Sequence, residues 1–218
     1  MKKIFSLVLT FVLIAGCVFM VTGCNKKENG KSGKKEKKDD TVVISYTHGK
    51  GVFKLSVPKD EEGNAKYEFT TEKPKEISTS STFYLVTDTA VFGFSTSGLS
   101  YNTSQKYKDK YGDVKATFAG YLEFIEDKDL FNKSYLPGLE QFKLNGRDAL
   151  RYYNRVGGSG DYDYYGYFYM IGVDDIYTGS RAGMTVNYKL EEKPKEAKEF
   201  DKETLSIIKS LKIEANTK

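Results

Sequence analysis

The chain has 218 residues, a net charge of +4, one histidine and two cysteines. The first 23 residues carry two lysines, and residues 25–40 carry seven lysines against four acidic side chains, so residues 41–218 have a net charge of −1. A nucleic-acid-binding domain carries its basic charge on the folded surface, and this distribution therefore argues against nucleic acid as a partner. Cys17 and Cys24 both precede the charged run, which excludes a disulfide framework after it.

The first segment has the pattern of a secretory signal. Met1-Lys2-Lys3 is followed by a nearly continuous apolar run from Ile4 to Val21, which is 18 residues long. A positive start before an apolar stretch is typical of a signal peptide, and the length is close to the lower limit for a bilayer-spanning helix. Under either interpretation we expect this segment to enter a membrane.

Two short stretches resemble the lipobox of bacterial lipoproteins. Val21-Thr22-Gly23-Cys24 and Ile14-Ala15-Gly16-Cys17 each place one aliphatic and two small residues before a cysteine. The resemblance implies a diacylglyceryl cysteine that carries acyl chains such as palmitate, with cleavage directly before it. Cys24 is favoured because a polar run follows it, whereas "VFMVTG" follows Cys17. Cys17 and an uncleaved anchor remain alternatives.

Lipidation at Cys24 predicts a protein anchored to the cell membrane and facing outside the cytoplasm. Burial of acyl chains contributes ~0.8 kcal/mol per CH₂, and two chains give a durable anchor where one does not. We expect a signal peptide at 1–23, a lipidated cysteine with a disordered lysine-rich tether at 24–40, one domain at 41–214 and a disordered tail at 215–218. As a flexible coil the tether spans roughly 20–24 Å, and its lysines suit an anionic membrane surface.

The first half of the domain alternates apolar and polar residues, which predicts strands. "TVVISYTHGKGVFKLSV" over 41–57 is typical of a hairpin with a Gly-Lys-Gly turn. Shorter strands are expected at 66–71, 81–88 and 90–97. Residues 98–112 are expected to be loop or partly helical. Over 114–131 the apolar spacing changes to three and four, which predicts a helix.

Three more strands are expected at 140–156, 162–173 and 182–190. A final helix follows Asp201, which can cap its free amides, with Phe200 and Leu205 as a hydrophobic staple. Leu205, Ile208 and Leu211 form its apolar stripe. Helices must cover a sheet to bury such stripes, so the prediction is an α+β domain, a mainly antiparallel sheet flanked by two helices.

Three stretches are similar to parts of Mog1/PsbP-like domains: "GVFKLSVP" at 51–58, "LNGRDALRYYN" at 144–154 and "FDKETLSIIKSLKI" at 200–213. The resemblance covers about residues 42–214. It implies an α/β/α sandwich and an accessory role in binding a partner protein or assembly. It carries no active-site motif to this chain, and no cofactor is expected.

The residues that could carry chemistry are few. His48 is the only histidine, and its place at a hairpin turn predicts a solvated side chain. "DYDYYG" from Asp161 begins like a calcium loop, but the fifth position is Tyr165 and the twelfth is Gly172, so the match fails. Asp174 and Asp175 are candidate paired carboxylates for an envelope hydrolase, the alternative function; a plain loop is the competing interpretation.

Three of the four arginines share parity on one predicted strand, with a tyrosine between them: Arg147, Arg151, Tyr153 and Arg155. Side chains at alternate positions project from one face of a strand, and guanidinium groups bind carboxylates or phosphates bidentately. We therefore expect a site for an envelope protein, an anionic polymer or a small ligand. The alternative is structural pairing with Asp161 and Asp163 across the hairpin. The neighbouring "YDYYGYFYM" is either a buried central strand or an aromatic groove.

Overall fold

The computed structural model describes residues 40–75, 80–156, 163–188 and 198–217, and all structural statements refer to these ranges. The predicted signal peptide, Cys17, Cys24 and almost all of the tether lie outside them. Within these ranges, no helix has both the length and the apolar character needed to cross a bilayer.

The smaller of two antiparallel sheets has the strand order β1-β2-β10. Its strands are β1 (Thr41–His48), β2 (Gly51–Pro58) and β10 (Lys212–Ala215). The predicted hairpin is confirmed, and Gly49 takes a φ of 55° in its turn. Strand β10 is not expected from the sequence, because four residues give too short a pattern. It includes Ala215, the first residue assigned to the predicted tail.

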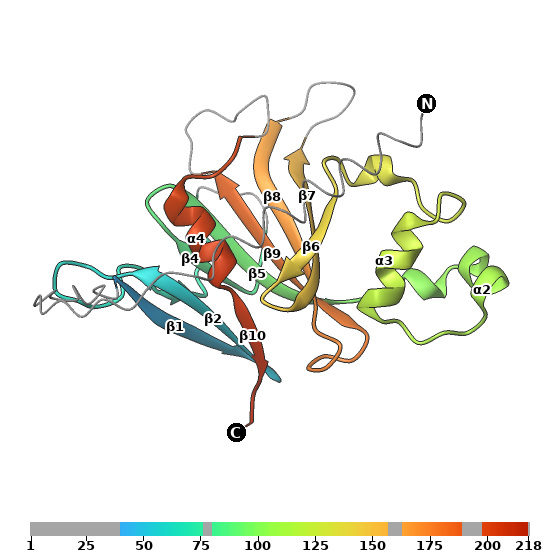
Figure 1. Ribbon diagram of the computed structural model, residues 1–218, viewed down its shortest axis with the longest axis horizontal. Coiled ribbons are helices and arrows are strands. Elements are labelled where there is room, and N and C mark those ends of the chain that lie inside the picture. The colour runs from blue at the N-terminus through green and yellow to red at the C-terminus, as the bar shows by residue number, and fades with distance from the viewer. Residues whose placement is uncertain (1–39, 76–79, 157–162, 189–197, 218) are drawn as a thin grey trace, which may run out of the picture. The chain divides into compact units, whose positions relative to one another are not determined.

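The larger sheet has seven antiparallel strands in the order β3-β4-β5-β9-β8-β7-β6 (Figure 1). Its strands are β3 (Phe69–Thr70), β4 (Phe83–Val86), β5 (Ala90–Gly98), β6 (Glu140–Leu144), β7 (Arg147–Val156), β8 (Asp163–Gly172) and β9 (Ser180–Tyr188). All seven fall within or close to stretches where alternation predicts strands. The tyrosine-rich strand β8 is central, and Tyr167, Tyr169 and Met170 on it are buried, as the core interpretation of this run expects.

One strand prediction is wrong. Residues 140–156 form two strands, β6 and β7, joined by a two-residue turn. The turn residues Asn145 and Gly146 have φ values of 48° and 85°. A turn with both central residues at positive φ matches the right-handed twist of a hairpin, and Asn-Gly is the sequence that favours it. The turn places β6 at the edge of the large sheet.

Three α-helices lie in the described ranges, where two are predicted: α2 (Gln105–Tyr111), α3 (Phe118–Glu126) and α4 (Lys202–Ser210). Two short 3₁₀ turns accompany them, η1 (Tyr101–Thr103) and η2 (Lys133–Tyr135). The predicted cap of α4 is confirmed, since Asp201 accepts a hydrogen bond from the Thr204 amide at 2.9 Å. The buried stripe of α4 includes Ile207 beside Ile208, while Leu205 is only partly buried.

The large sheet has a different cover on each face. One face, here the α4 face, shares a core with α4 and the small sheet, in which Phe53, Phe83 and Phe94 are fully buried. The opposite face, here the α3 face, packs Leu150 and Met170 against Phe118 and Ile125 of α3. Figure 1 shows α4 and α3 near different parts of the sheet. Each fully buried phenylalanine contributes about 1.5–3 kcal/mol. With two antiparallel sheets and three α-helices in its described ranges, the domain is mixed α+β with mostly antiparallel strands.

Candidate functional site

A groove on the α4 face lies beside the edge strand β6. It consists of two cavities of about 370 and 260 Å³ that share Leu144 in their walls. We call it the β6 groove. The larger cavity lies between the β6–β7 turn and β10, and the smaller lies between β6 and α4. Phe142, Leu205 and Ile208 give the smaller cavity an apolar floor, and Lys209 and Glu140 stand at its rim. Two of the predicted arginines line the groove, one in each cavity.

Arg147 in the larger cavity is fully engaged in contacts within the protein. Its Nη1 and Nη2 atoms donate to the two carboxylate oxygens of Asp175 at 2.6 and 2.9 Å. It also donates to the backbone carbonyls of Ile213, at 2.9 and 3.1 Å, and Gly172, at 3.1 Å. The Arg147 guanidinium lowers the pKa of the Asp175 carboxyl group. The hydrogen bonds to Ile213 tie β7 to β10, and those to Gly172 and Asp175 tie it to the end of β8.

Arg151 in the smaller cavity is also paired. Its Nε atom donates to Glu140 at 2.7 Å, and its guanidinium carbon lies 4.8 Å from the centre of the Tyr167 ring. Glu199 lies further away, at 3.7 Å from Nη2. Burial alone would lower the pKa of Arg151, but the hydrogen bond to Glu140 raises it, and the net direction is upward. Arg151 therefore stays charged and held in place.

Of the remaining members of the predicted strip, only the side chain of Tyr153 is described, and it packs within the domain. Tyr153 lies on the same face, with its ring 5.4 Å from that of Tyr167 and close to Gly138. Arg155 belongs to β7, but the pairing with β8 shifts register between Asn154 and Arg155. The side chain of Arg155 lies outside the described residues.

The pairing partners differ from those considered in the sequence. Asp161 and the side chain of Asp163 lie outside the described residues. The described carboxylates that neutralise the two arginines are Asp175 and Glu140, which come from a loop after β8 and from the edge strand. Neither is across the predicted hairpin.

Asp174 and Asp175 point to different parts of the domain. Asp174 accepts a hydrogen bond from the Phe118 amide at 2.7 Å, at the start of α3. Asp175 is bound by Arg147, which favours its charged form. A carboxylate with a lowered pKa is a poor general acid. The arrangement gives the hydrolase alternative no support.

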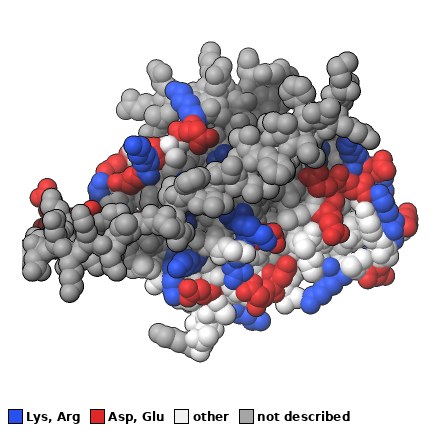
Figure 2. Space-filling view, viewed as in Figure 1, with Lys and Arg blue, Asp and Glu red and all other residues white. Residues whose placement is uncertain are grey.

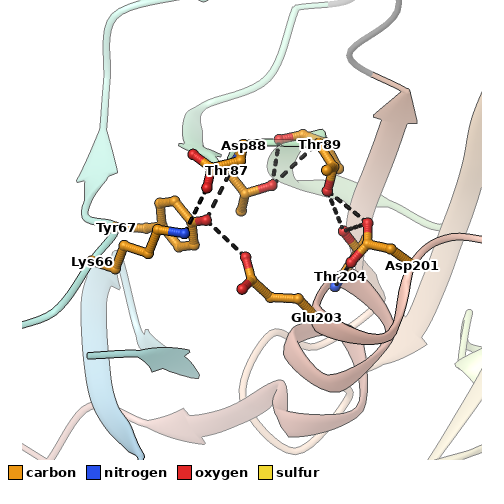
Figure 3. A network of polar contacts seen from close by, with 9 residues as sticks. Lys66, Tyr67, Thr87, Asp88, Thr89, Asp201, Glu203 and Thr204 are labelled. Atoms are coloured by element: carbon orange, nitrogen blue, oxygen red, sulfur yellow. Dashed lines mark hydrogen bonds and ion pairs between the residues drawn. The ribbon is translucent and has the colours of Figure 1, made fainter. Parts of the chain in front are cut away.

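Another group of carboxylates surrounds the start of α4 (Figure 3). Thr89 donates to Asp201 at 2.6 Å and lies 3.1 Å from the Thr204 hydroxyl. Tyr67 donates to Glu203 at 2.7 Å. The contacts of Thr89 fasten α4 to the turn between β4 and β5, and the contact of Tyr67 fastens it to the segment before β3. Because each contact satisfies a partner inside the domain, we assign the group a structural role.

His48 has no acidic partner in the described part of the chain. Its Nε2 atom lies 3.3 Å from the Thr96 hydroxyl, and its ring is half-buried rather than solvated as predicted. No group of three or more histidine, cysteine or acidic side chains in the described ranges could hold a metal ion.

Basic and acidic side chains lie interspersed across the face seen in Figure 2.

Comparison of the chain with family models, curated proteins and solved structures gives no match. The β6 groove is the feature that sequence reasoning missed. It depends on β10 and on the turn at Asn145, and the Asn-Gly pair is the one signal in the sequence that could have indicated it.

Proposed function

We propose that this protein is a bacterial lipoprotein, anchored through a diacylglyceryl group on Cys24 at the outer face of the cell membrane. The lipobox-like stretch, the preceding apolar run and the lysine-rich segment after it support the anchor. We further propose that the domain has a Mog1/PsbP-like architecture. The three stretches that resemble that family and the mostly antiparallel α+β fold support this assignment.

The proposed activity is binding: the β6 groove receives an extended segment of an envelope protein. The observation that carries this proposal is an unpaired strand edge beside an apolar groove. Within the described part of the chain, β7 is the only strand that pairs with β6. An exposed edge can take an additional strand from a partner, with pockets beside it for alternate side chains.

The turn determines which backbone groups of β6 face outward. Leu144 and Arg147 flank the two-residue turn and exchange hydrogen bonds, so residues at alternate positions bond to β7. The amides and carbonyls of Gln141 and Lys143 then point to the free edge. An added strand that pairs with them would place side chains beside Phe142 and Leu144, at the apolar part of the groove.

The anchor is tested by metabolic labelling of cells with an alkyne analogue of palmitate. We expect label on the full chain and on Cys17→Ala, and no label on Cys24→Ala. The reverse pattern would move the lipid to Cys17. Absence of label from all three chains would refute the lipid anchor and leave the groove proposal standing.

Binding is tested with a photo-crosslinking amino acid placed on α4. Lys209 lines the groove, whereas Lys202 is exposed at the other end of the same helix and serves as the matched control. We expect a partner protein to crosslink from position 209 and not from position 202. Equal yields from both positions would refute docking in the groove.

A second pair of variants isolates strand addition. Lys143→Pro removes an outward amide, and proline is tolerated at a strand edge whose amide faces solvent. Lys143→Ala removes only the side chain. We expect the proline variant to lose the crosslink from position 209 and the alanine variant to keep it. A crosslink that survives the proline would exclude strand addition as the binding mode.

A further inference from the structure

Three buried polar atoms lack a hydrogen-bond partner among the described residues, and all three belong to the α3 side of the large sheet. They are Asp174 Oδ1, Arg181 Nη1 and Asn187 Nδ2. Leaving a buried polar atom unsatisfied costs about 1–3 kcal/mol, and more for a charged group. Arg181 carries the largest cost, because it is a cation whose Nη1 atom has no partner among the described residues, although its guanidinium also hydrogen-bonds with the Tyr152 hydroxyl.

The surroundings of Arg181 are aromatic. Its guanidinium carbon lies 5.4 Å from the centre of the Phe168 ring. Tyr152 stacks on Phe168 with ring centres 5.4 Å apart and an interplanar angle of 30°. Tyr121 approaches from α3, where its ring lies 6.2 Å from that of Phe118. Four elements, α3, β7, β8 and β9, therefore contribute to one cluster.

Two further observations place the cation within this cluster. Burial raises the pKa of the Tyr121 and Tyr152 hydroxyl groups, and the positive charge of Arg181 opposes that rise at both. Gly183 leaves room for the ring of Phe168, since a Cβ atom there would lie 3.1 Å from Phe168 Cζ. The glycine thus lets Phe168 lie against β9 beside Arg181.

Of the other two unsatisfied atoms, that of Asn187 lies away from Arg181. Asn187 follows Arg181 by six residues on β9, which is about 20 Å along a strand. Its Oδ1 atom accepts from Asn154 at 2.8 Å, so part of its bonding is met within the sheet. Asp174 is an acceptor held at the start of α3 and would repel an anion.

We propose that Arg181, with Tyr121, Tyr152 and Phe168, binds the carboxylate group of a ligand that has an aromatic or apolar body. A carboxylate matches the guanidinium fork and satisfies Nη1. The rings of Tyr121, Tyr152 and Phe168 are half-buried, and their exposed parts offer stacking surfaces for the body of the ligand. The site lies on the face of the sheet opposite the β6 groove and is independent of it.

The test uses the full chain in detergent micelles with benzoate as the probe. The chain has four arginines, so the side-chain Nε–H region of a ¹⁵N NMR spectrum holds at most four arginine signals. Each signal is assigned from the matching Arg→Lys variant. We expect benzoate to shift the Arg181 signal saturably and to leave the signals of Arg147 and Arg151 in place. Benzamide, a neutral molecule of the same shape, should leave all four in place.

The variants separate a bound carboxylate from nonspecific stacking. Arg181→Lys keeps the charge and loses the fork, and we expect it to weaken benzoate binding at least about tenfold by calorimetry. Arg151→Lys is the matched control and should retain the affinity of the native chain. The proposal is overturned if benzoate does not shift Arg181, if benzamide shifts it equally, or if Arg181→Lys binds benzoate as well as the native chain does. Inorganic phosphate that binds where benzoate does not would overturn the carboxylate class.

Discussion

The arginines on the two faces of the large sheet differ in how many of their donors have partners. On the α4 face, Arg147 and Arg151 each have carboxylate partners, and Arg147 also binds two backbone carbonyls. On the α3 face, Arg181 has a buried donor without a partner among the described residues. Natural proteins give up local stability at functional sites and recover it elsewhere. Neighbours, rather than residue type, decide whether all the donors of an arginine are satisfied within the described part of the domain.

The strongest test compares Arg147→Met with Arg181→Met. Arg147→Met leaves Asp175 and two carbonyls without their donor, and we expect it to lower the free energy of unfolding by about 2–3 kcal/mol. Arg181→Met removes the unsatisfied Nη1 donor together with the contacts of the guanidinium with Phe168 and Tyr152; these effects oppose each other, so we expect a change within about 0.5 kcal/mol. Urea unfolding measures both. Equal losses would abolish the contrast between the faces and make Arg181 a structural residue.

A smaller effect is expected at the start of α4. Asp201→Ala removes the helix cap and the contact with Thr89, and we expect a loss of about 1 kcal/mol in urea unfolding. Ser206→Ala, at an exposed position of the same helix, is the control and should change little. A loss below the error of the control would mean that the network in Figure 3 does not stabilise the α4 face.

The smallest effect concerns the helices on the α3 side. The hydrogen bond from Lys110 lowers the pKa of Asp127 to about 2, and Tyr111 also donates to this carboxylate. A carboxyl group with a lowered pKa in the folded state stabilises it above the unfolded-state pKa. That stabilisation is lost as pH falls through the folded value, here from about pH 4 towards pH 2. The protection of α2 amides against hydrogen exchange, relative to the unfolded chain at the same pH, should fall over this range.

Asp127→Asn provides the control for the acid effect. The amide cannot titrate, so the protection of α2 against exchange should already be lower at neutral pH and should lose nothing further from this site on acidification. Native protection of α2 that persists unchanged at pH 2 would show that the contact of Asp127 with Lys110 contributes nothing measurable to the α3 side.

Local patterns predicted the elements whose determinants lie close in sequence. Alternation identified the β1–β2 hairpin, and the cap at Asp201 identified α4. Strand β10 and the pairing of Arg147 depend on distant residues: Arg147 meets Asp175 and Ile213, which follow it by 28 and 66 residues. Parity on one strand could place Arg147 and Arg151 on one face but could not name their partners.

The site around Arg181 was missed for a related reason. Arg181 stands alone in sequence, and its aromatic neighbours come from three other elements. A single arginine in a predicted strand gives no signal by itself. The sheet order β9-β8-β7 and the packing of α3 on this face bring the four residues together. Neither can be inferred from the local sequence around Arg181.

The pairing of β10 with β2 has a consequence for how the domain is made. These two strands are neighbours in space but lie far apart in the sequence. Lys54 on β2 binds Glu214 on β10 at a separation of 160 residues. A growing chain cannot complete the small sheet until residues 212–215 have been synthesised. Contacts this distant in sequence slow folding. The small sheet therefore has to wait for β10, although β2 is synthesised about 160 residues earlier.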